Sequence, residues 1–314
     1  MMSPTDAHGF QAPGSQGRGS QGRGSQGRGS QGRGSRGPGF RAHGGPYAHE
    51  LRAAVSAAEH AGSLLTGSFA RARTLRHKGA GADVALDLDL LAEEAILGRL
   101  RSAFPGDRFL SEEAGLLDGN GDRTWLIDPL DGSNNVAIGL PAYAVGIGLV
   151  TGGRPVLGVV HEPVTGSTWH AVTGRGAHGA AGPLPGPSSR LPASGPVVAW
   201  TQGYSVGRSH PAASCLLGTL ERLSWRVLQL WAPLLAWTML ARGVIDGFVG
   251  FEAEGIDLPA GALLAAEAGV ELRTLSGGRF EPGYAGPASA RSFVAGRGET
   301  LEALLGVARA VGPR

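Results

Sequence analysis

Two carboxylates, Asp128 and Asp131, stand three residues apart in the segment Asp-Pro-Leu-Asp-Gly-Ser, which follows a short apolar run. Residues 124 to 127 are predicted to form a buried strand because their apolar side chains are bounded by polar and turn-forming residues. Pro129 cannot donate a ladder hydrogen bond, so we expect the strand to end at Asp128 and the chain to turn. Carboxylate oxygens presented together in this way suit a divalent cation such as Mg²⁺.

The residues that follow have the types needed to bind an anion. Gly132 lets the backbone approach a ligand closely, and Ser133 and Asn134 are common at the start of a helix. A short helix beginning there would direct its free N–H groups and the positive end of its dipole toward a phosphate. Taken alone, the same residues are equally typical of a strand followed by a type I turn.

Acidic residues elsewhere in the chain favour the metal-binding interpretation. Glu112 and Glu113 end another short apolar run, where neighbouring like charges repel unless a cation or solvent screens them. Asp257 begins a segment that is predicted to be a helix closed by Gly269. Alone, the glutamates would indicate a solvated loop and Asp257 an ordinary N-cap.

Three segments together resemble the inositol monophosphatase family of Mg²⁺-dependent, lithium-sensitive-type phosphatases, in order and approximate separation. They are the glutamate pair, the Asp-Pro-Leu-Asp-Gly-Ser segment, and the Asp-x-x-Ala-Gly-x-Leu-Leu-x-x-Glu-Ala-Gly segment that begins at Asp257. The resemblance covers roughly residues 47 to 314. It implies a mixed α/β fold, a five-layer αβαβα sandwich, for residues 46 to 314. The site is then expected between subdomains of about residues 46 to 185 and 186 to 314.

The resemblance also implies a ligand set for two or three Mg²⁺ ions, with Mn²⁺ able to substitute. In that set Glu112 ligates the first metal and Asp128 bridges two metals, while Asp131 and Asp257 resemble ligands of the second. The backbone carbonyl of Leu130 corresponds to a further ligand. Acidic ligands without histidine or cysteine are a donor set that Mg²⁺ prefers.

The resemblance also implies which residues bind the phosphate group and the attacking water. The backbone N–H groups of Gly132 and Ser133 match the positions that hold the phosphate, and Asn134 and Asp257 are assigned to the substrate. In relatives a threonine stands at the Ser133 position and, with an aspartate, orients the attacking water. Serine keeps the hydroxyl that this role needs.

Asp89 is the matching aspartate, found by counting from Lys78 and Asp83, which resemble the family's Lys-x-x-x-x-Asp segment. Asp87 is a nearby alternative. Asp89, Ser133 and Glu112 therefore form the expected catalytic set.

The implied reaction is Mg²⁺-dependent hydrolysis of a small phosphate monoester, an inositol phosphate or a related sugar or polyol phosphate, by attack of a metal-activated water. Such esters are anionic and have a poor leaving group, so charge must be neutralised at both the attacking and the departing oxygen. Relatives also hydrolyse 3′-phosphoadenosine-type nucleotides, histidinol phosphate and fructose 1,6-bisphosphate, and the sequence leaves these open. A catalytically weak member used for binding is a further alternative, against which the complete set of acids argues.

The surface that would recognise the alcohol departs from the family's pattern. Residues 230 to 233, Leu-Trp-Ala-Pro, occupy the place of a small-residue segment that lines the substrate pocket of relatives. Gly250 stands where an acid often binds sugar hydroxyls, although Glu252 and Glu254 are close by, and Ile256 replaces a usual tryptophan. These differences predict a different or narrower choice of phosphate ester.

Residues 1 to 45 differ from the rest of the chain in composition. A Ser-Gln-Gly-Arg-Gly unit repeats from Ser15 through Gly34, and this Gly, Arg, Ser and Gln-rich segment is predicted to be disordered because it has almost no apolar residue to bury. It carries six Arg and one Asp, whereas the remaining chain has 22 basic and 25 acidic side chains. The basic character belongs to the tail, so nucleic acid is not expected as a partner except weakly, through that tail. An RNA-associated scaffold that works through it is the alternative.

The remaining composition bounds the class of protein. One cysteine, Cys215, excludes an intramolecular disulfide and suits a reducing compartment, and we expect it to fill the core on a helix. No apolar run reaches the about 18 residues of a membrane span, and the N-terminus lacks the apolar core of a secretory signal. We therefore expect a cytoplasmic protein with a small phosphorylated metabolite as partner and no membrane. Relatives are often dimers, which implies a homodimer.

Hydrophobic periodicity predicts the elements that position these residues. Amphipathic helices are expected over residues 48 to 72 and 88 to 103, and an antiparallel meander over 142 to 151, 155 to 161 and 167 to 173. Residues 180 to 196, dense in Pro, Gly and Ser, are predicted to be a linker. Beyond it we expect helices near 209 to 223 and 231 to 243 and strands near 197 to 201, 225 to 230 and 291 to 295.

Overall fold

The computed structural model describes residues 44 to 69, 75 to 77, 84 to 117, 119 to 184, 186 and 193 to 311, with the backbone alone for 75 to 77 and 84 to 86. These residues belong to one compact unit, Phe40–Arg314. Lys78, Asp83 and nearly all of the predicted tail lie outside the described residues.

The first layer of strands carries the two acidic segments of the candidate site. Within the described residues it is an eight-stranded sheet in the order β10-β9-β8-β7-β6-β5-β3-β4. Its strands are β3 (Arg108–Ser111), β4 (Gly115–Leu117), β5 (Arg123–Asp131), β6 (Ala144–Thr151), β7 (Arg154–Glu162), β8 (Ser167–Val172), β9 (Ala177–Gly179) and β10 (Gly182–Pro183). Strands β5 to β9 run antiparallel in succession, which confirms the predicted meander, and β3 lies parallel to β5.

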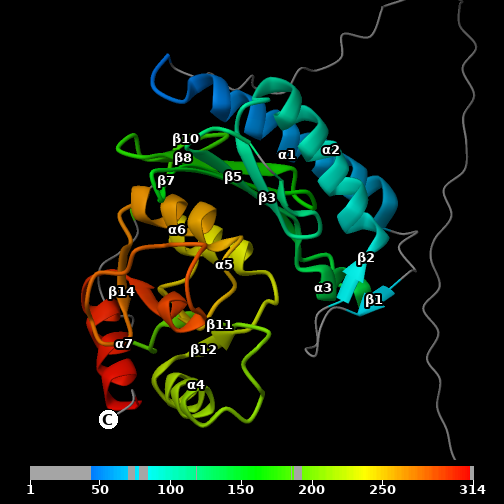
Figure 1. Cartoon of the computed structure of the whole chain (residues 1–314). Coiled ribbons are helices and arrows are strands. Elements are labelled where there is room, and N and C mark those ends of the chain that lie inside the picture. Colours follow the sequence, from blue (N-terminus) through cyan, green and yellow to red (C-terminus); the bar gives the residue numbers. More distant parts are fainter. Residues whose placement is uncertain are drawn as a thin grey trace, which may run out of the picture. The chain divides into compact units, whose positions relative to one another are not determined.

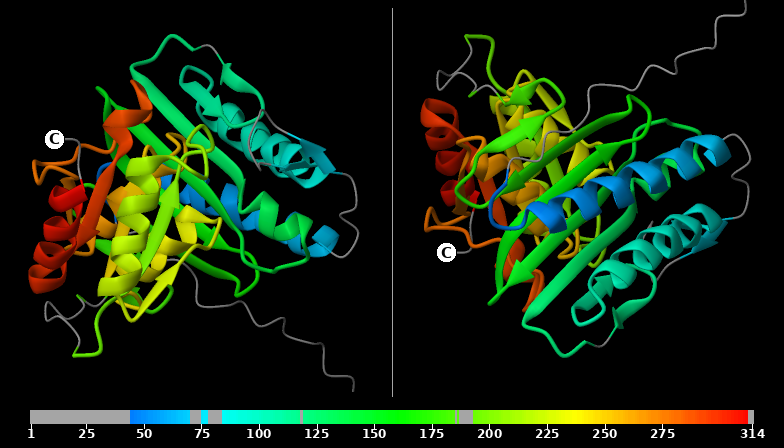
Figure 2. Two further views of the ribbon diagram at one scale, coloured as in Figure 1. Left: turned by 90° about the horizontal axis from the view of Figure 1, so that it is seen from below. Right: turned by 90° about the horizontal axis from the view of Figure 1, so that it is seen from above.

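Two long helices cover one face of this sheet (Figure 1; Figure 2, right). They are α1 (Ala48–Ser68) and α2 (Asp87–Ala103), at the places that the apolar periodicity predicts. Buried residues recur along each helix at helical spacing, for example Ala54, Ala58 and Ala61 of α1. The small alanines let α1 lie close to the strands.

A second sheet forms another layer and mixes parallel and antiparallel pairs. Its order is β12-β11-β13-β15-β14. The strands are β11 (Val197–Gln202), β12 (Arg226–Leu228), β13 (Gly247–Phe251), β14 (Glu271–Thr274) and β15 (Phe293–Gly296). Helices α4 (Pro211–Leu223) and α7 (Gly298–Val311) cover its outer face.

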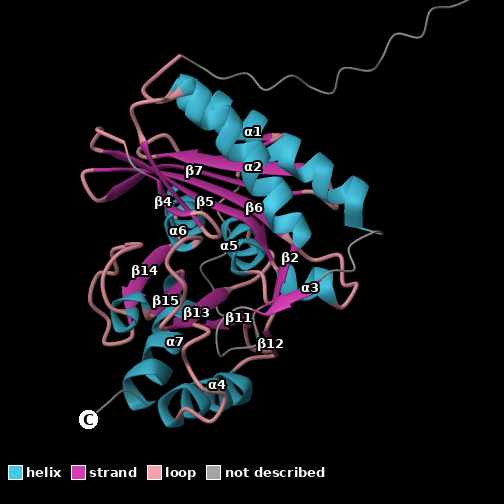
Figure 3. Cartoon of the chain, turned by 45° about the vertical axis from the view of Figure 1, so that its right-hand side comes forward, coloured by secondary structure: helices cyan, strands magenta, loops and turns pink. Residues whose placement is uncertain are grey.

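Helices α5 (Pro233–Ala241) and α6 (Leu258–Glu267) lie between the two sheets, as Figure 3 shows. The resulting order of layers is helices, sheet, helices, sheet, helices, so the five-layer αβαβα prediction is confirmed. Close contact between α6 and the first sheet depends on Gly158 of β7, where an added Cβ would lie 2.6 Å from the carbonyl oxygen of Ala260.

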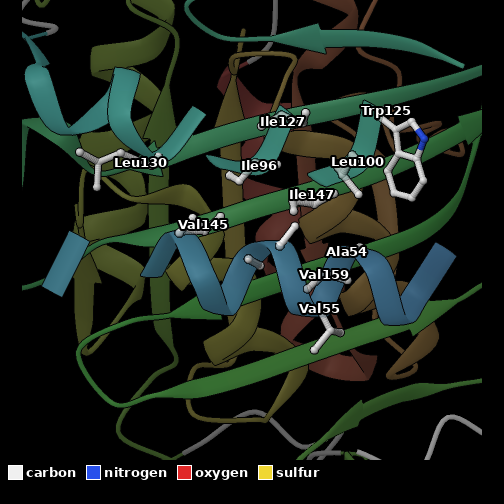
Figure 4. Close-up of a cluster of buried hydrophobic side chains, with 14 of the residues drawn as sticks. Ala54, Val55, Ile96, Leu100, Trp125, Ile127, Leu130, Val145, Ile147 and Val159 are labelled. Atoms are coloured by element: carbon white, nitrogen blue, oxygen red, sulfur yellow. The ribbon is translucent and has the colours of Figure 1, made fainter. Parts of the chain in front are cut away.

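Each interface between layers holds its own apolar cluster. Figure 4 shows the cluster between the first sheet and helices α1 and α2, which includes Ile96, Trp125 and Ile147. Trp169 and Leu234 belong to the cluster between the first sheet and the central helices. Two further clusters lie on either side of the second sheet. Because both sheets are packed on both faces, the positions of their strand ends are fixed.

Four short elements complete the described backbone. Strands β1 (Leu75–His77) and β2 (Val84–Leu86) form an antiparallel pair, α3 (Ser133–Ala137) follows β5, and η2 (Ala288–Arg291) precedes β15. In this part of the chain we find no helix with the length and apolar character that crossing a membrane requires. Cys215 is exposed on α4, so the expectation that it fills the core is wrong.

Candidate metal and phosphate site

The parallel pairing of β3 with β5 brings the first two acids, Glu112 and Asp128, together. Ser111 of β3 pairs with Ile127 of β5, and the N–H of Glu112 donates to the carbonyl oxygen of Ile127 at 3.2 Å. Because the strands are parallel and paired in this register, Glu112, the first residue after β3, comes level with Asp128 of β5.

Strand β5 does not end at Asp128, as the sequence had predicted, but continues to Asp131 through a β-bulge. Asp128 pairs with Gly146 and Asp131 with Ala144, so β5 has one extra residue between these pairs. Proline is tolerated in a strand at such an irregularity, because the missing N–H is not needed there. The N–H of Leu130 instead donates to Asp128 Oδ1 at 3.2 Å. The bulge presents both aspartates within one strand.

Asp257 comes from the other half of the chain, immediately before α6. It occupies the N-cap position, but its side chain makes no capping hydrogen bond, and its Oδ1 is buried without a hydrogen-bond partner. The interpretation as an ordinary N-cap therefore fails. A buried carboxylate oxygen without a donor is costly unless another group, such as a cation, compensates it.

The pKa values show that the four acids act on one another. Burial, followed by the charges of Glu112, Asp131, Asp257 and Asp89, raises the pKa of Asp128 well above its usual range. Burial and the charge of Asp257 likewise raise the pKa of Asp131, although N–H groups of α5 oppose the shift. The pKa of Asp257 rises to about 7, mainly through burial. The structure thus brings Glu112, Asp128, Asp131 and Asp257 into one electrostatic cluster.

This cluster has the donor chemistry of a Mg²⁺ site without a preformed cage. Across the ranges that the structure describes, no three His, Cys, Asp or Glu side chains stand in an arrangement that could hold a metal ion directly. The raised pKa values and the unpartnered Asp257 Oδ1 nevertheless show that ionised carboxylates here lack a compensating cation, and hard carboxylate oxygens fit Mg²⁺. The donor chemistry of these residues therefore fits the ion.

Gly132 and Ser133 directly follow the second aspartate of the bulge. The N-cap of α3 is Gly132, with a left-handed φ of 100°, and Ser133 is its first helical residue, so the predicted cap moves by one position. An added Cβ at residue 132 would lie 2.8 Å from the carbonyl oxygen of Ala142, so glycine is required on two grounds. Ser133 and Asn134 are both buried.

Asp89, rather than its alternative Asp87, lies beside the cluster. Asp89 is buried in the first turn of α2 and contributes to the raised pKa of Asp128, whereas Asp87 is exposed.

Gly250 offers no polar group to the site. It lies within β13, and an added Cβ would lie 2.6 Å from Cζ of Phe293, so this position faces the core. Glu254 is the acid next to the site: it contributes to the raised pKa of Asp257, and its Oε1 accepts from the N–H of Tyr204 at 2.8 Å. The sequence indicated this residue only as one of two acids, Glu252 and Glu254, that lie close to Gly250 in the chain.

The segment from Leu230 to Pro233 borders the site. The Asn135 amide donates to the carbonyl oxygens of Leu230 at 2.6 Å and Ala142 at 2.7 Å, and the Cβ of Ala232 lies close to Gly132. Trp231 has a left-handed φ of 51° and is 52% exposed. A bulky residue in this conformation is uncommon and strained. The segment therefore holds an exposed indole next to Ala232, the residue that lies against Gly132.

Comparisons with known proteins agree with this architecture. The model of the inositol monophosphatase family matches residues 47–311. Inositol monophosphatase 2 of Solanum lycopersicum is 31% identical over 239 residues, 73% of this chain and 88% of that protein. A fructose-1,6-bisphosphatase/inositol-1-monophosphatase of Thermococcus kodakarensis is 33% identical over 201 residues, 63% of this chain and 73% of that protein.

A solved structure shares the fold. The extragenic suppressor protein suhB of Bartonella henselae superposes with a TM-score of 0.74 at 26% identity, covering 82% of this chain and 98% of that one. The family match over most of the chain, together with the fold and the acidic segments, leads to one conclusion: this chain belongs to the inositol monophosphatase family.

Proposed function

We propose that this chain is a Mg²⁺-dependent phosphatase that hydrolyses a small phosphate monoester, an inositol phosphate or a related sugar or polyol phosphate. The main support is the convergence of Glu112, Asp128, Asp131 and Asp257, whose burial and repulsion raise the pKa of Asp128. Retaining several buried acids in one cluster is costly unless cations compensate them. The relatives named as inositol monophosphatases support the substrate class.

These four carboxylates, with the carbonyl of Leu130, are the groups that would hold the metal. When bound, Mg²⁺ neutralises phosphate charge, makes a water more acidic and stabilises the departing oxygen. The chain's own contribution would be to supply oxygen donors from β5, from the turn after β3 and from the start of α6.

The phosphate and the attacking water are held by residues that adjoin the acids. The N–H groups of Gly132 and Ser133, at the start of α3, would bind phosphate oxygens and fix the direction of attack. The Ser133 hydroxyl would accept a hydrogen bond from the water and donate its own proton toward Asp89. Asp89 is buried beside Asp128 and suits this role. Asn134 and Asp257 complete the surface facing the substrate.

The choice of alcohol would depend on the segment that borders Gly132. Ala232 lies against Gly132, and Trp231 is held in a strained, exposed conformation by neighbours that are fixed to Asn135 and Asp131. An indole at this position limits the space beside the phosphate and favours a narrow set of esters.

Phosphate release from a panel of esters tests the proposal. The panel contains inositol 1-phosphate, fructose 1,6-bisphosphate, 3′-phosphoadenosine 5′-phosphate and histidinol phosphate, each with Mg²⁺ and with EDTA. We expect Mg²⁺-dependent release from at least one ester and a loss of roughly 100-fold or more in Asp128→Asn. Asp122→Asn, at an exposed position just before β5 and at the opposite end of that strand from Asp128, is the matched control. Full activity of Asp128→Asn, or no release from any ester, would contradict the proposal.

A further inference from the structure

Glu93 is a buried acid that the proposed chemistry does not use. It lies on α2, one helical turn after Asp89, and is 5% exposed. Its Oε1 accepts two backbone hydrogen bonds, from the N–H of Glu113 and from the N–H of Ala114, each at 3.0 Å. Both donors belong to the turn between β3 and β4 that carries Glu112. The buried carboxylate of Glu93 therefore binds the backbone of the turn that carries Glu112.

Hydrogen bonds from two sides hold this turn. Strands β3 and β4 pair antiparallel over three residues only, ending with Ser111 opposite Gly115. On the strand side, the Glu112 N–H donates to Ile127 of β5 at 3.2 Å. On the helix side, Glu93 binds the next two N–H groups. Glu112 is thus fixed between β5 and α2, and hydrogen bonds to a carboxylate are stronger than those between neutral groups.

We infer that Glu93 is a positioning residue that holds Glu112 in place for metal binding, an inference that rests on the proposed function. Asp89 and Glu93 are four residues apart, so they share one face of α2. The same rigid helix therefore carries the acid beside Asp128 and the anchor of the Glu112 turn. Displacing this anchor would move a metal ligand without removing it.

Isothermal titration with Mg²⁺ alone tests this role on the full chain. Glu93→Ala should weaken Mg²⁺ affinity about tenfold or more, because loss of a group that orients a ligand typically costs 10- to 100-fold. Glu94→Ala removes an exposed acid from the adjacent position of α2 and is expected to keep wild-type affinity. Glu93→Gln, whose amide oxygen can still accept both N–H groups, should keep most of the affinity. In phosphate release, Glu93→Ala should raise the Mg²⁺ concentration required for half-maximal rate.

Hydrogen exchange gives a second readout that does not depend on the metal. In the metal-free wild type, the amides of Glu113 and Ala114 should be protected, and Glu93→Ala should remove that protection while leaving the amides of β6 unchanged. If Glu93→Ala does not fold, Glu93→Asp, which withdraws the carboxylate by one methylene, should show the same weakening compared with Glu94→Asp.

The possible results distinguish a failure of the Glu93 role from a failure of the proposed phosphatase function. A wild type that binds Mg²⁺ and releases phosphate, with Glu93→Ala equal to Glu94→Ala in affinity, overturns the role of Glu93 alone. Equal losses in Glu93→Gln and Glu93→Ala also overturn it, because the role depends on the acceptor. A wild type that neither binds Mg²⁺ nor releases phosphate overturns the proposed function, and the inference with it.

Discussion

The N–H of Leu234 donates to Asp131 Oδ2 at 2.7 Å, which joins the first turn of α5 directly to the end of β5. Leu234 itself is buried among the side chains between the first sheet and the central helices. Asp131 thus has two roles. Its Oδ2 anchors α5, and its carboxylate group is also a member of the acidic cluster. Changes at this cluster should therefore affect stability as well as activity.

Neutralising one acid should stabilise the metal-free protein. Burial and the charges of four neighbouring acids raise the pKa of Asp128, so folding near neutral pH forces this group either to take up a proton or to keep an unfavourable charge. Asp128→Asn removes that cost, so we expect the free energy of unfolding to rise by about 1 kcal/mol in EDTA. With Mg²⁺ the order should reverse, because only the wild type gains the full binding energy. Urea unfolding of both proteins with EDTA and with Mg²⁺ measures this. A lower stability of Asp128→Asn in EDTA, relative to Asp122→Asn, would contradict the repulsion argument.

The metal-free protein should lose stability as the pH rises through neutrality. The pKa of Asp257 is raised from its ordinary value of 3.8 to about 7 in the folded chain, so the folded protein keeps a proton that the unfolded chain releases. The stabilisation from this group is complete below the unfolded pKa and is lost as the pH rises through about 7. The Tm in EDTA should fall between about pH 5.5 and pH 8, and fall less with Mg²⁺, which compensates the ionised acids. A Tm in EDTA that rises over this interval would show that the cluster does not retain its protons.

Trp231→Gly should stabilise the fold. The left-handed φ of 51° costs a side-chain-bearing residue about 1–2 kcal/mol, whereas glycine adopts it freely. The greater flexibility of glycine in the unfolded chain offsets roughly 0.5–1 kcal/mol, which leaves a net gain of up to about 1 kcal/mol in urea unfolding. Trp231→Ala is the control, since alanine loses the indole but keeps the strained Cβ and should show no gain. Equal stabilities of the glycine and alanine variants would indicate that the backbone at this position is unstrained.

Two glycines in different surroundings should respond to alanine in opposite directions. Gly158→Ala places a Cβ 2.6 Å from the backbone oxygen of Ala260 and should destabilise the protein by about 1–3 kcal/mol, because α6 has to move from the sheet. Gly98→Ala, in α2 with no atom near the added Cβ, should stabilise it by up to about 1 kcal/mol. Thermal unfolding of both variants checks the pair. A mild effect of Gly158→Ala would mean that the two layers are less closely packed than the structure shows.

Regular elements of the fold could be predicted from periodicity, because burial on one face imposes it. The alanine and leucine spacing of α1 and α2 and the apolar runs of β6, β7 and β8 correspond to the observed elements within a few residues. The bulge of β5 could not be predicted in this way. Pro129 is a strand breaker by local rules, and only the pairing of Asp128 and Asp131 with β6 shows why the strand continues.

The acidic residues of the site could be predicted from the sequence, but the residues that hold them in position could not. Carboxylates at the ends of apolar runs are visible in the sequence, and the structure brings Glu112, Asp128, Asp131 and Asp257 together. The anchoring of the Glu112 turn by Glu93 depends on how α2 packs against the sheet, which no local pattern contains. The choice between Glu252 and Glu254 stayed open for the same reason, because it depends on the path of the chain between β13 and Asp257.

The position of Asp257 also bears on when the site can form during synthesis. Strands β3 and β5 are made well before α6, and a chain is synthesised from its N-terminus. A nascent chain that ends before α6 carries three of the four acids but lacks the last. Synthesis must pass Asp257 before the set is complete, so a translation product that stops earlier lacks one of the proposed metal ligands even if its first sheet has folded.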